Sequence, residues 1–150
     1  MPDHSPETLP DPAAAGWRAV EDVGFERCLG PFWSKPLPPG TAGSAAEPAL
    51  WALKTDARHA NRNDRVHGGV IASLADHAMG NSARAAVDGQ ATATIQMDMQ
   101  FIASGKPGEF LVARTEVLRR TRSMVFLRCE ISAGARRVAL ATGVWKILGA

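Results

Sequence analysis

The sequence predicts an α+β domain in which an antiparallel sheet wraps around one long helix. Apolar residues recur at three- and four-residue intervals after Gly68, which is the period of an amphipathic helix. From about Ala93 to the end of the chain, apolar and polar residues alternate, which is the period of strands. A helix and a sheet that each have one apolar face bury those faces against each other.

The start of the chain carries weaker signals. Met1–Ala15 is rich in Pro, Asp and Ala, which is typical of a disordered lead-in, so we expect a single domain over residues 16–150. Ala13–Leu29 has apolar residues at roughly helical spacing, interrupted at Gly24, and this pattern predicts a short amphipathic helix or two pieces of one.

Further strands are expected before the long helix. A strand end near Trp33 is followed by a loop over Gly40–Pro48 and by a strand at Ala49–Lys54. His59–Arg65 is polar and rich in Asn, Asp and Arg, which is the composition of a loop.

The long helix is predicted to continue to about Val87, and Asp88–Gly89 ends it. Short turns separate the strands that follow, which predicts an antiparallel meander. In the first of these strands, Thr94 falls on the polar face. The strands are expected at Ala93–Phe101, Phe110–Arg119, Val125–Ile131 and Arg137–Leu148.

Composition narrows the function classes. The formal net charge is +2, and Tyr is absent, so base stacking and nucleic-acid binding are disfavoured. Cys28 and Cys129 are far apart without CxxC spacing, so we expect neither a disulfide framework nor a metal site, and a cytoplasmic location. No basic segment followed by an apolar run begins the chain, and no apolar stretch reaches the ~20 residues that a membrane helix needs. No cofactor is predicted.

The loop-to-helix junction His67-Gly68-Gly69 is the first candidate for chemistry. A helix start offers unpaired N–H groups and a partial positive charge, and glycines let a ligand approach the backbone closely. Such a site can hold a carbonyl oxygen that becomes negative during acyl transfer. The alternative is that the glycines only make a tight turn and that His67 only caps or packs.

Asp76 is the second candidate, because aspartate is a poor residue for a helix interior. Partial removal of its carboxylate from water would make it a stronger base, which would help to activate a water molecule. The alternative is a solvated surface aspartate. The helix face around it carries mostly small residues, which lets another element come close: Ala72, Ser73, Met79, Gly80 and Ala83.

Spacing along the helix limits how these groups could cooperate. Gly69 and Asp76 are separated by roughly 10 Å at ~1.5 Å per residue. A general base and an oxyanion donor must both lie within ~3 Å of the reacting atoms. Two antiparallel copies of the helix across a twofold axis would satisfy this requirement, so an active enzyme must be at least a dimer.

These residues together resemble a known family. Asn61-x5-His67-Gly68-Gly69 followed by Leu74-Ala75-Asp76 is similar to the signature of hotdog-fold thioesterases, in the phenylacetate-pathway (PaaI-like) branch of the thioesterase superfamily. Gly24-Phe25-Glu26-Arg27-x-Leu29-Gly30, the Asp98–Ile102 strand and the Arg119–Arg122 turn also resemble that branch. The similarity extends from about Gly24 to the C-terminus. It implies a sheet wrapped around the central helix and dimers whose sheets join edge to edge, often paired again into homotetramers.

The resemblance also implies roles for individual residues. Gly69 would donate its backbone N–H to the thioester carbonyl, Asn61 would add a side-chain donor or orient water, and His67 would position the site. Asp76 of the opposing subunit would activate water or attack directly, and the Thr94 hydroxyl would help to hold that water. Two alternatives stay open: Asn63 could replace Asn61, and Thr94 could be an ordinary surface residue.

Arginines near the C-terminus are the candidates for binding the phosphates of coenzyme A. Arg119, Arg120 and Arg122 lie at a junction between two strands and could make charge-assisted bonds to phosphate. The alternative is a solvated turn or pairing with nearby glutamates.

Hydrolysis of an acyl-CoA thioester to a free acid and CoA is therefore the leading hypothesis. A hydratase or dehydratase of acyl thioesters is a second enzyme class that uses this fold, since fold alone does not determine the reaction. A non-catalytic acyl-CoA-binding or regulatory module is a third, which would need no Asp76. The acyl group stays open.

Overall fold

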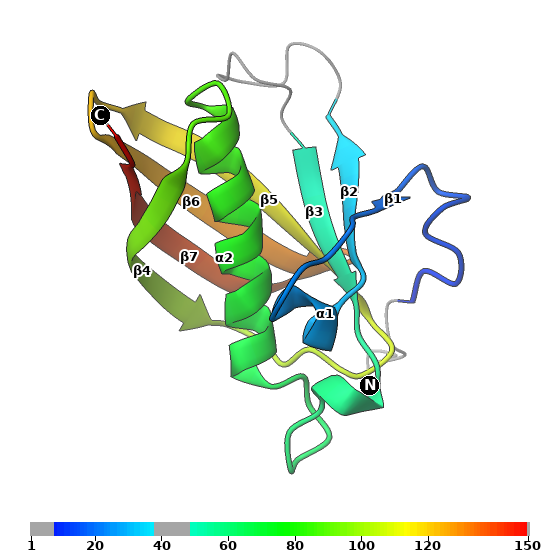
Figure 1. Ribbon diagram of the computed structural model, residues 1–150. Coiled ribbons are helices and arrows are strands. Elements are labelled where there is room, and N and C mark those ends of the chain that lie inside the picture. The colour runs from blue at the N-terminus through cyan, green and yellow to red at the C-terminus, as the bar shows by residue number, and fades with distance from the viewer. Residues whose placement is uncertain (1–7, 38–48, 150) are drawn as a thin grey trace.

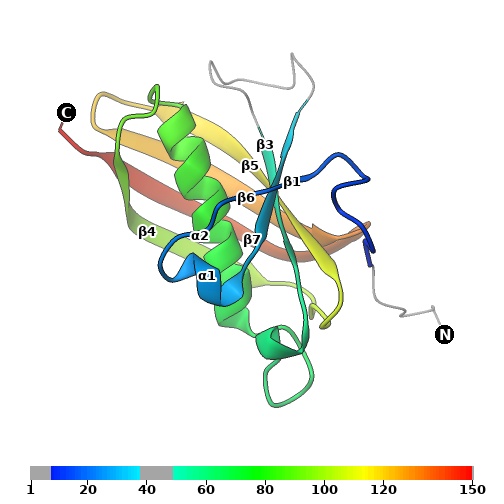
Figure 2. The same cartoon turned by 45° about the vertical axis from the view of Figure 1, so that its right-hand side comes forward.

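The computed structural model describes residues 8–37 and 49–149 of the chain. One long helix lies against one face of a seven-stranded antiparallel sheet (Figures 1 and 2). This arrangement confirms the predicted α+β architecture. The predicted loop at Gly40–Pro48 lies outside the described residues. The elements are β1 Arg18–Ala19, α1 Glu26–Leu29, β2 Phe32–Pro36, β3 Ala49–Lys54, the 3₁₀ turn η1 Ala57–His59, α2 Gly68–Ala85, β4 Thr92–Phe101, β5 Phe110–Arg120, β6 Met124–Ala133 and β7 Arg136–Ile147.

The strand order is β1-β2-β3-β5-β6-β7-β4. β5, β6 and β7 form the expected meander, but the prediction that β4 begins it was wrong, because β4 pairs with the far side of β7. The chain between β4 and β5 crosses the sheet instead of making a hairpin. In this connection Ile102 and Ala103 donate to the carbonyl of Val138, and Gly105 accepts from the Val66 N–H near the start of α2. β4 is consequently an edge strand.

The helix α2 forms as the apolar spacing predicts. His67 is its N-cap residue and accepts a hydrogen bond through its side chain. One side of the helix is packed on the sheet, where Leu74, Ala75, Ala78 and Met79 are fully buried. The predicted inner face of β6 is also confirmed, because Val125, Leu127, Cys129 and Ile131 are all buried in this core.

The prediction of a helix over Ala13–Leu29 was wrong for most of its length. Residues 12–16 form a turn, β1 pairs with β2, and only the single turn α1 is helical. The apolar residues divide between two cores: Leu29 packs against the main core, whereas Trp17 packs on Phe110, with 5.1 Å between ring centroids. Gly24 has φ +54°, which lies outside the helical region.

The described part of the predicted disordered lead-in is packed. Leu9 and Ala15 contact a second, smaller cluster of Trp17, Ala52 and Phe110. The Lys54 Nζ donates to the carbonyl of Pro10 at 3.0 Å. Residues 8–15 therefore belong to the folded unit, contrary to expectation. Within the described residues, no helix is long and apolar enough to cross a membrane.

Candidate active site

Asp76 lies on the side of α2 that faces away from the meander, and its carboxylate is exposed in the single chain. The Thr94 hydroxyl on β4 donates to its Oδ1 at 2.8 Å. The structure thus brings together two of the predicted site residues, Asp76 and Thr94, which are 18 positions apart in sequence. The predicted removal of Asp76 from water does not occur within one chain, so it would require a second copy.

A β-bulge in β4 explains why Thr94 reaches Asp76. The pairing of β4 with β7 shifts register between Thr94 and Gln96, so Ile95 is an extra residue. Simple alternation would place Thr94 with Gln96 and Asp98 on the polar face. The bulge instead turns Thr94 toward α2 and leaves Ile95 52% exposed. The prediction that Thr94 lies on the polar face of the strand and Ile95 on the apolar face was wrong, although the predicted hydroxyl lies beside Asp76.

The start of α2 presents one backbone donor that is free among the described residues. The predicted carbonyl-binding group, the Gly69 N–H, donates at 2.9 Å to Nδ1 of His67, so it is engaged within the chain. The Val70 N–H donates to the His67 carbonyl. The Gly68 N–H has no hydrogen-bond partner in the described part of the chain. Since Nδ1 of His67 accepts, its proton is on Nε2.

Asn61 organises the loop that precedes this helix start. Its Oδ1 accepts from the backbone N–H groups of Asn63 and Arg65, at 2.8 and 3.2 Å. Its side-chain NH₂ makes no hydrogen bond with the described residues and is free to donate to a ligand. In the rival candidate Asn63, only the backbone takes part in this turn. The loop thus holds the side chain of Asn61 in place, whereas the side chain of Asn63 makes no hydrogen bond with the described residues.

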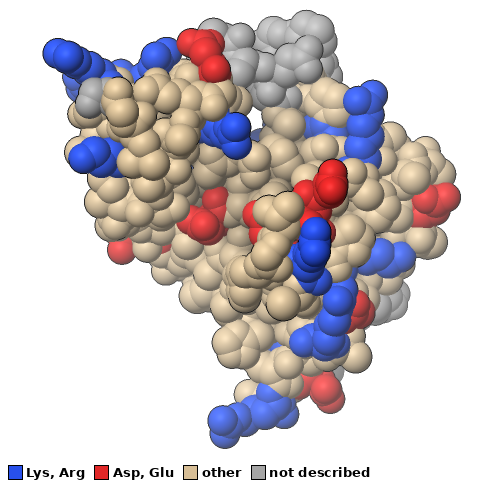
Figure 3. All heavy atoms as spheres, viewed as in Figure 1, with Lys and Arg blue, Asp and Glu red and all other residues tan. Residues whose placement is uncertain are grey.

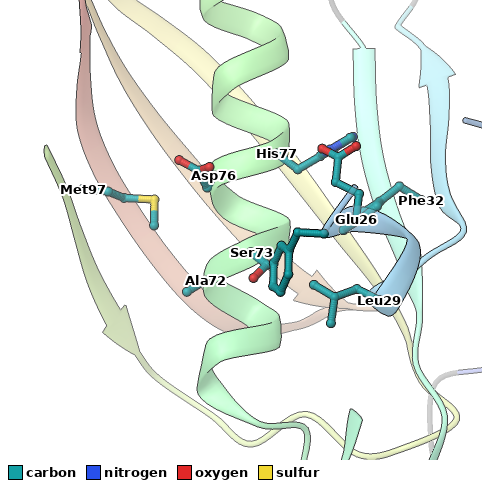
Figure 4. A pocket seen from close by; sticks show the side chains of 9 residues that line it. Glu26, Leu29, Phe32, Ala72, Ser73, Asp76, His77 and Met97 are labelled. Atoms are coloured by element: carbon teal, nitrogen blue, oxygen red, sulfur yellow. The ribbon is translucent and has the colours of Figure 1, made fainter. Parts of the chain in front are cut away.

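Two hollows meet at Asp76. One, of about 290 Å³, is mostly apolar and includes Leu29, Phe32 and Met97 in its walls (Figure 4). The other, of about 320 Å³, is more polar and extends along α2 past Asn81 to Arg84. The residues that line both hollows are Glu26, Asp76 and His77. A bond to be cleaved beside Asp76 would thus have an apolar space on one side and a polar space on the other.

His77 is a site residue that the sequence analysis missed. Its side chain is 5% exposed, and its Nδ1 lies 2.7 Å from Oε1 of Glu26. Its ring is stacked on Phe32 at 4.3 Å between centroids and meets Trp51 edge to face at 4.9 Å. A histidine between the apolar residues of α2, directly after Asp76, was a signal that could have been used. Its partner Glu26 is 51 positions away, which no local pattern shows.

Acidic and basic side chains are interspersed over the face on which α2 lies, and both kinds occur in its middle and at its upper and lower ends (Figure 3). The predicted phosphate-binding residues Arg119, Arg120 and Arg122 are exposed at the turn from β5 to β6. This turn is near the C-terminal end of α2, opposite to the end that carries His67 (Figures 1 and 2). The three arginines make no ion pair or hydrogen bond through their side chains within the described residues.

One chain therefore holds two separate halves of the predicted site. The Asp76–Thr94 pair lies in the middle of α2, and the Gly68 N–H, Asn61 and His67 lie at its start. About 12 Å of helix separates Gly68 from Asp76, at ~1.5 Å per residue.

Comparison with known proteins shows which family this chain belongs to. Residues 63–140 match the thioesterase superfamily. The chain belongs to the thioesterase superfamily. This segment contains the start of α2, Asp76 and Thr94, and membership makes the protein a thioester hydrolase, as the sequence predicts.

Two curated relatives align with most of this thioesterase. A Pseudomonas aeruginosa protein whose name describes it as an esterase, PA0474, is 28% identical over 120 residues, covering 79% of this chain and 84% of that protein. Human acyl-coenzyme A thioesterase 13 is 24% identical over 119 residues, covering 79% of this chain and 80% of that protein.

Solved structures confirm the predicted hotdog fold and the PaaI-like resemblance. The Escherichia coli PaaI protein from the phenylacetic acid degradation operon superposes with a TM-score of 0.62 at 26% identity, covering 67% of this chain and 72% of that chain. The Bacillus halodurans protein BH2602, solved with CoA, superposes with a TM-score of 0.61 at 26% identity, covering 66% of each chain.

Proposed function

We propose that this thioesterase hydrolyses an acyl-CoA and that each active site is built from two subunits. The observation that carries the proposal is the exposed Asp76–Thr94 pair, which faces open space between an apolar and a polar hollow. The similarity to an acyl-coenzyme A thioesterase and to a structure that contains CoA supports CoA as the leaving group.

Asp76 activates a water molecule, or attacks the thioester carbonyl directly. The Thr94 hydroxyl orients the carboxylate through the 2.8 Å bond to Oδ1. As the carbonyl carbon becomes tetrahedral, its oxygen gains negative charge and needs preorganised donors. When Asp76 takes a proton from water, the resulting hydroxide forms the new C–O bond, the C–S bond breaks, and the CoA thiolate takes up the proton, which leaves a free carboxylic acid. When Asp76 attacks directly, breaking of the C–S bond leaves an anhydride between the acyl group and Asp76, and water hydrolyses this anhydride to the carboxylic acid.

The donors come from the start of α2 in a second subunit. The Gly68 N–H has no partner among the described residues and lies at the positive end of the helix dipole, so we assign to it the role first predicted for Gly69. The Asn61 NH₂ is a second donor, and His67 holds the helix start by accepting the Gly69 N–H. The unpaired edge of β4 is the natural place for two sheets to join. A homodimer is the smallest active unit, and a homotetramer would pair two such dimers.

Coenzyme A would extend along the polar hollow toward the C-terminal end of α2. Arg119, Arg120 and Arg122 at that end have guanidinium groups with no partner in residues 8–37 and 49–149, and these groups could bind its phosphates. The two free cysteines, with Cys129 buried, are compatible with a cytoplasmic enzyme.

The first test is thiol release from a panel of aryl and fatty acyl-CoAs, with wild type and Asp76→Ala. Turnover that collapses in the variant, while light scattering shows the oligomer intact, supports the proposal. No thiol release from any acyl-CoA, or release unaffected by the substitution, contradicts it.

A mixing experiment tests the shared site. Gly68→Pro removes the donor yet suits the first helical position, and the extended backbone of His67 (ψ 136°) is compatible with a following proline. Gly68→Ala keeps the N–H and is the matched control. Asp76→Ala and Gly68→Pro subunits assembled together should recover about a quarter of wild-type activity, since half of the dimers are mixed and each has one intact site. No recovery would mean that each site is built from one subunit.

A further inference from the structure

We infer that the one-turn helix α1 selects the acyl group and that the Glu26–His77 pair fixes α1 in the selecting position. The inference rests on the proposed function, since it concerns the apolar hollow beside Asp76. Glu26 is thus a positioning residue, acting through the wall that it holds and not on the reacting atoms.

The apolar hollow is where an acyl group next to Asp76 would lie. Phe25 and Leu29 come from α1 and its N-cap, Phe32 from β2, and Met97 from β4 (Figure 4). Its volume of about 290 Å³ is at the lower end of ligand pockets, so it suits a compact apolar acyl group and not a whole acyl-CoA. A large part of its wall is therefore contributed by the α1 segment.

α1 is too short to hold its own position. It has four residues and no side-chain N-cap bond, whereas isolated helices are marginal below ~12–15 residues. Val23 and Phe25 beside it are 61% and 67% exposed, so they contribute little packing within the chain. Leu29 packs against the main core, and the rest of the wall must be placed by specific polar contacts to the rest of the protein.

These contacts lie at both ends of α1. At its C-terminal end, the His59 Nε2 donates to the Leu29 carbonyl at 2.8 Å, and Arg58 donates to the Gly30 carbonyl. At its N-terminal end, Glu26 accepts from His77 at 2.7 Å. Among the described residues, this is the one side-chain hydrogen bond from α1 to α2, the helix that carries Asp76.

His77 is placed for this task, and its side chain makes no other hydrogen bond in the part of the chain described. Its Nε2 is buried without a hydrogen bond, and its ring is held by Phe32 and Trp51. A carboxylate only accepts hydrogen bonds, so Nδ1 carries the proton that is shared with Glu26. Loss of this acceptor would leave a buried donor unsatisfied and would release the wall that carries Phe25.

The test compares acyl selectivity, measured as the ratio of kcat/KM for the best-cleaved acyl-CoA to that for acetyl-CoA. Glu26→Ala is expected to lower this ratio about tenfold, the size of effect that one missing apolar contact has in a pocket. Glu26→Gln keeps an acceptor for Nδ1 and should restore the ratio. Glu21→Ala is the matched control, because Glu21 is exposed and has no partner among the described residues.

A double variant shows whether the effect passes through the wall. Phe25→Ala should lower the ratio in the same direction, and Glu26→Ala combined with Phe25→Ala should lower it little further, because coupled residues are not additive. Active enzyme with an unchanged ratio in Glu26→Ala, or additive losses in the double variant, would overturn the inference and leave the proposed function standing. A wild type that cleaves no acyl-CoA would overturn both.

Discussion

The two sides of α2 differ in how far a single chain buries them: one side is packed into the core, and the other is open. On the sheet side, Leu74, Ala75, Ala78 and Met79 are fully buried, and the core needs nothing further. On the other side, Asp76 is exposed between two hollows. Because the same helix carries both, stability and activity should depend on different residues only one or two positions apart. The open side is where the proposed second subunit would complete the site.

The sharpest test of this comparison is Asp76→Asn. The amide keeps the shape of the side chain and its acceptor for Thr94 but is a poor base, so we expect kcat to fall about 10²–10⁴-fold. The melting temperature should stay within about 2 °C of wild type, because the residue is exposed. Asp88→Asn, at an exposed left-handed position just after the helix that asparagine tolerates, is the control for the same chemical change. A large loss of stability in Asp76→Asn would mean that the two sides are not independent.

Leu74→Ala should give the opposite result two positions away. Its side chain is 0% exposed, so truncation leaves a cavity and should lower the free energy of unfolding by about 2–5 kcal/mol. Urea denaturation measures this loss, and the kcat of the folded fraction should change little. Leu118→Ala at a 52% exposed position is the control and should change stability by less than about 0.5 kcal/mol. An equal loss of stability in Leu74→Ala and Asp76→Asn would contradict the division of α2 into a core side and a site side.

Thr94→Val tests the contact that the bulge in β4 creates. Valine keeps the shape but removes the hydrogen bond to the Asp76 carboxylate, so kcat/KM should fall about tenfold. Thr94→Ser keeps the hydroxyl and should retain most of the activity. If the valine and serine variants are equally active, Thr94 is the ordinary surface residue that the sequence also allowed.

The buried side of α2 could be predicted from sequence because helical periodicity reports packing directly. Asp76 was also identifiable, since a charged residue in that helix is unusual. Periodicity could not show the bulge at Ile95, which reverses the facing of Thr94, nor the pairing of β4 with β7, because turn residues do not specify which strand lies alongside. His77 and Glu26 escaped notice because they meet only through the tertiary fold.

The smallest expected effect concerns Asp22, which leads into α1 and accepts the Phe32 N–H. Burial raises the pKa of this carboxyl above its ordinary value, and the nearby Glu26 adds to the rise, against the opposing bond from Phe32. A raised pKa in the folded state means that the protonated form contributes stability at low pH, and this contribution is lost as the pH rises through the folded value. Asp22→Asn should therefore raise the melting temperature by less than about 2 °C at pH 7 and leave it unchanged near pH 3. Thermal melts at both pH values measure this difference, and a variant less stable than wild type at pH 7 would show that the charge at Asp22 supports the α1 segment instead of straining it.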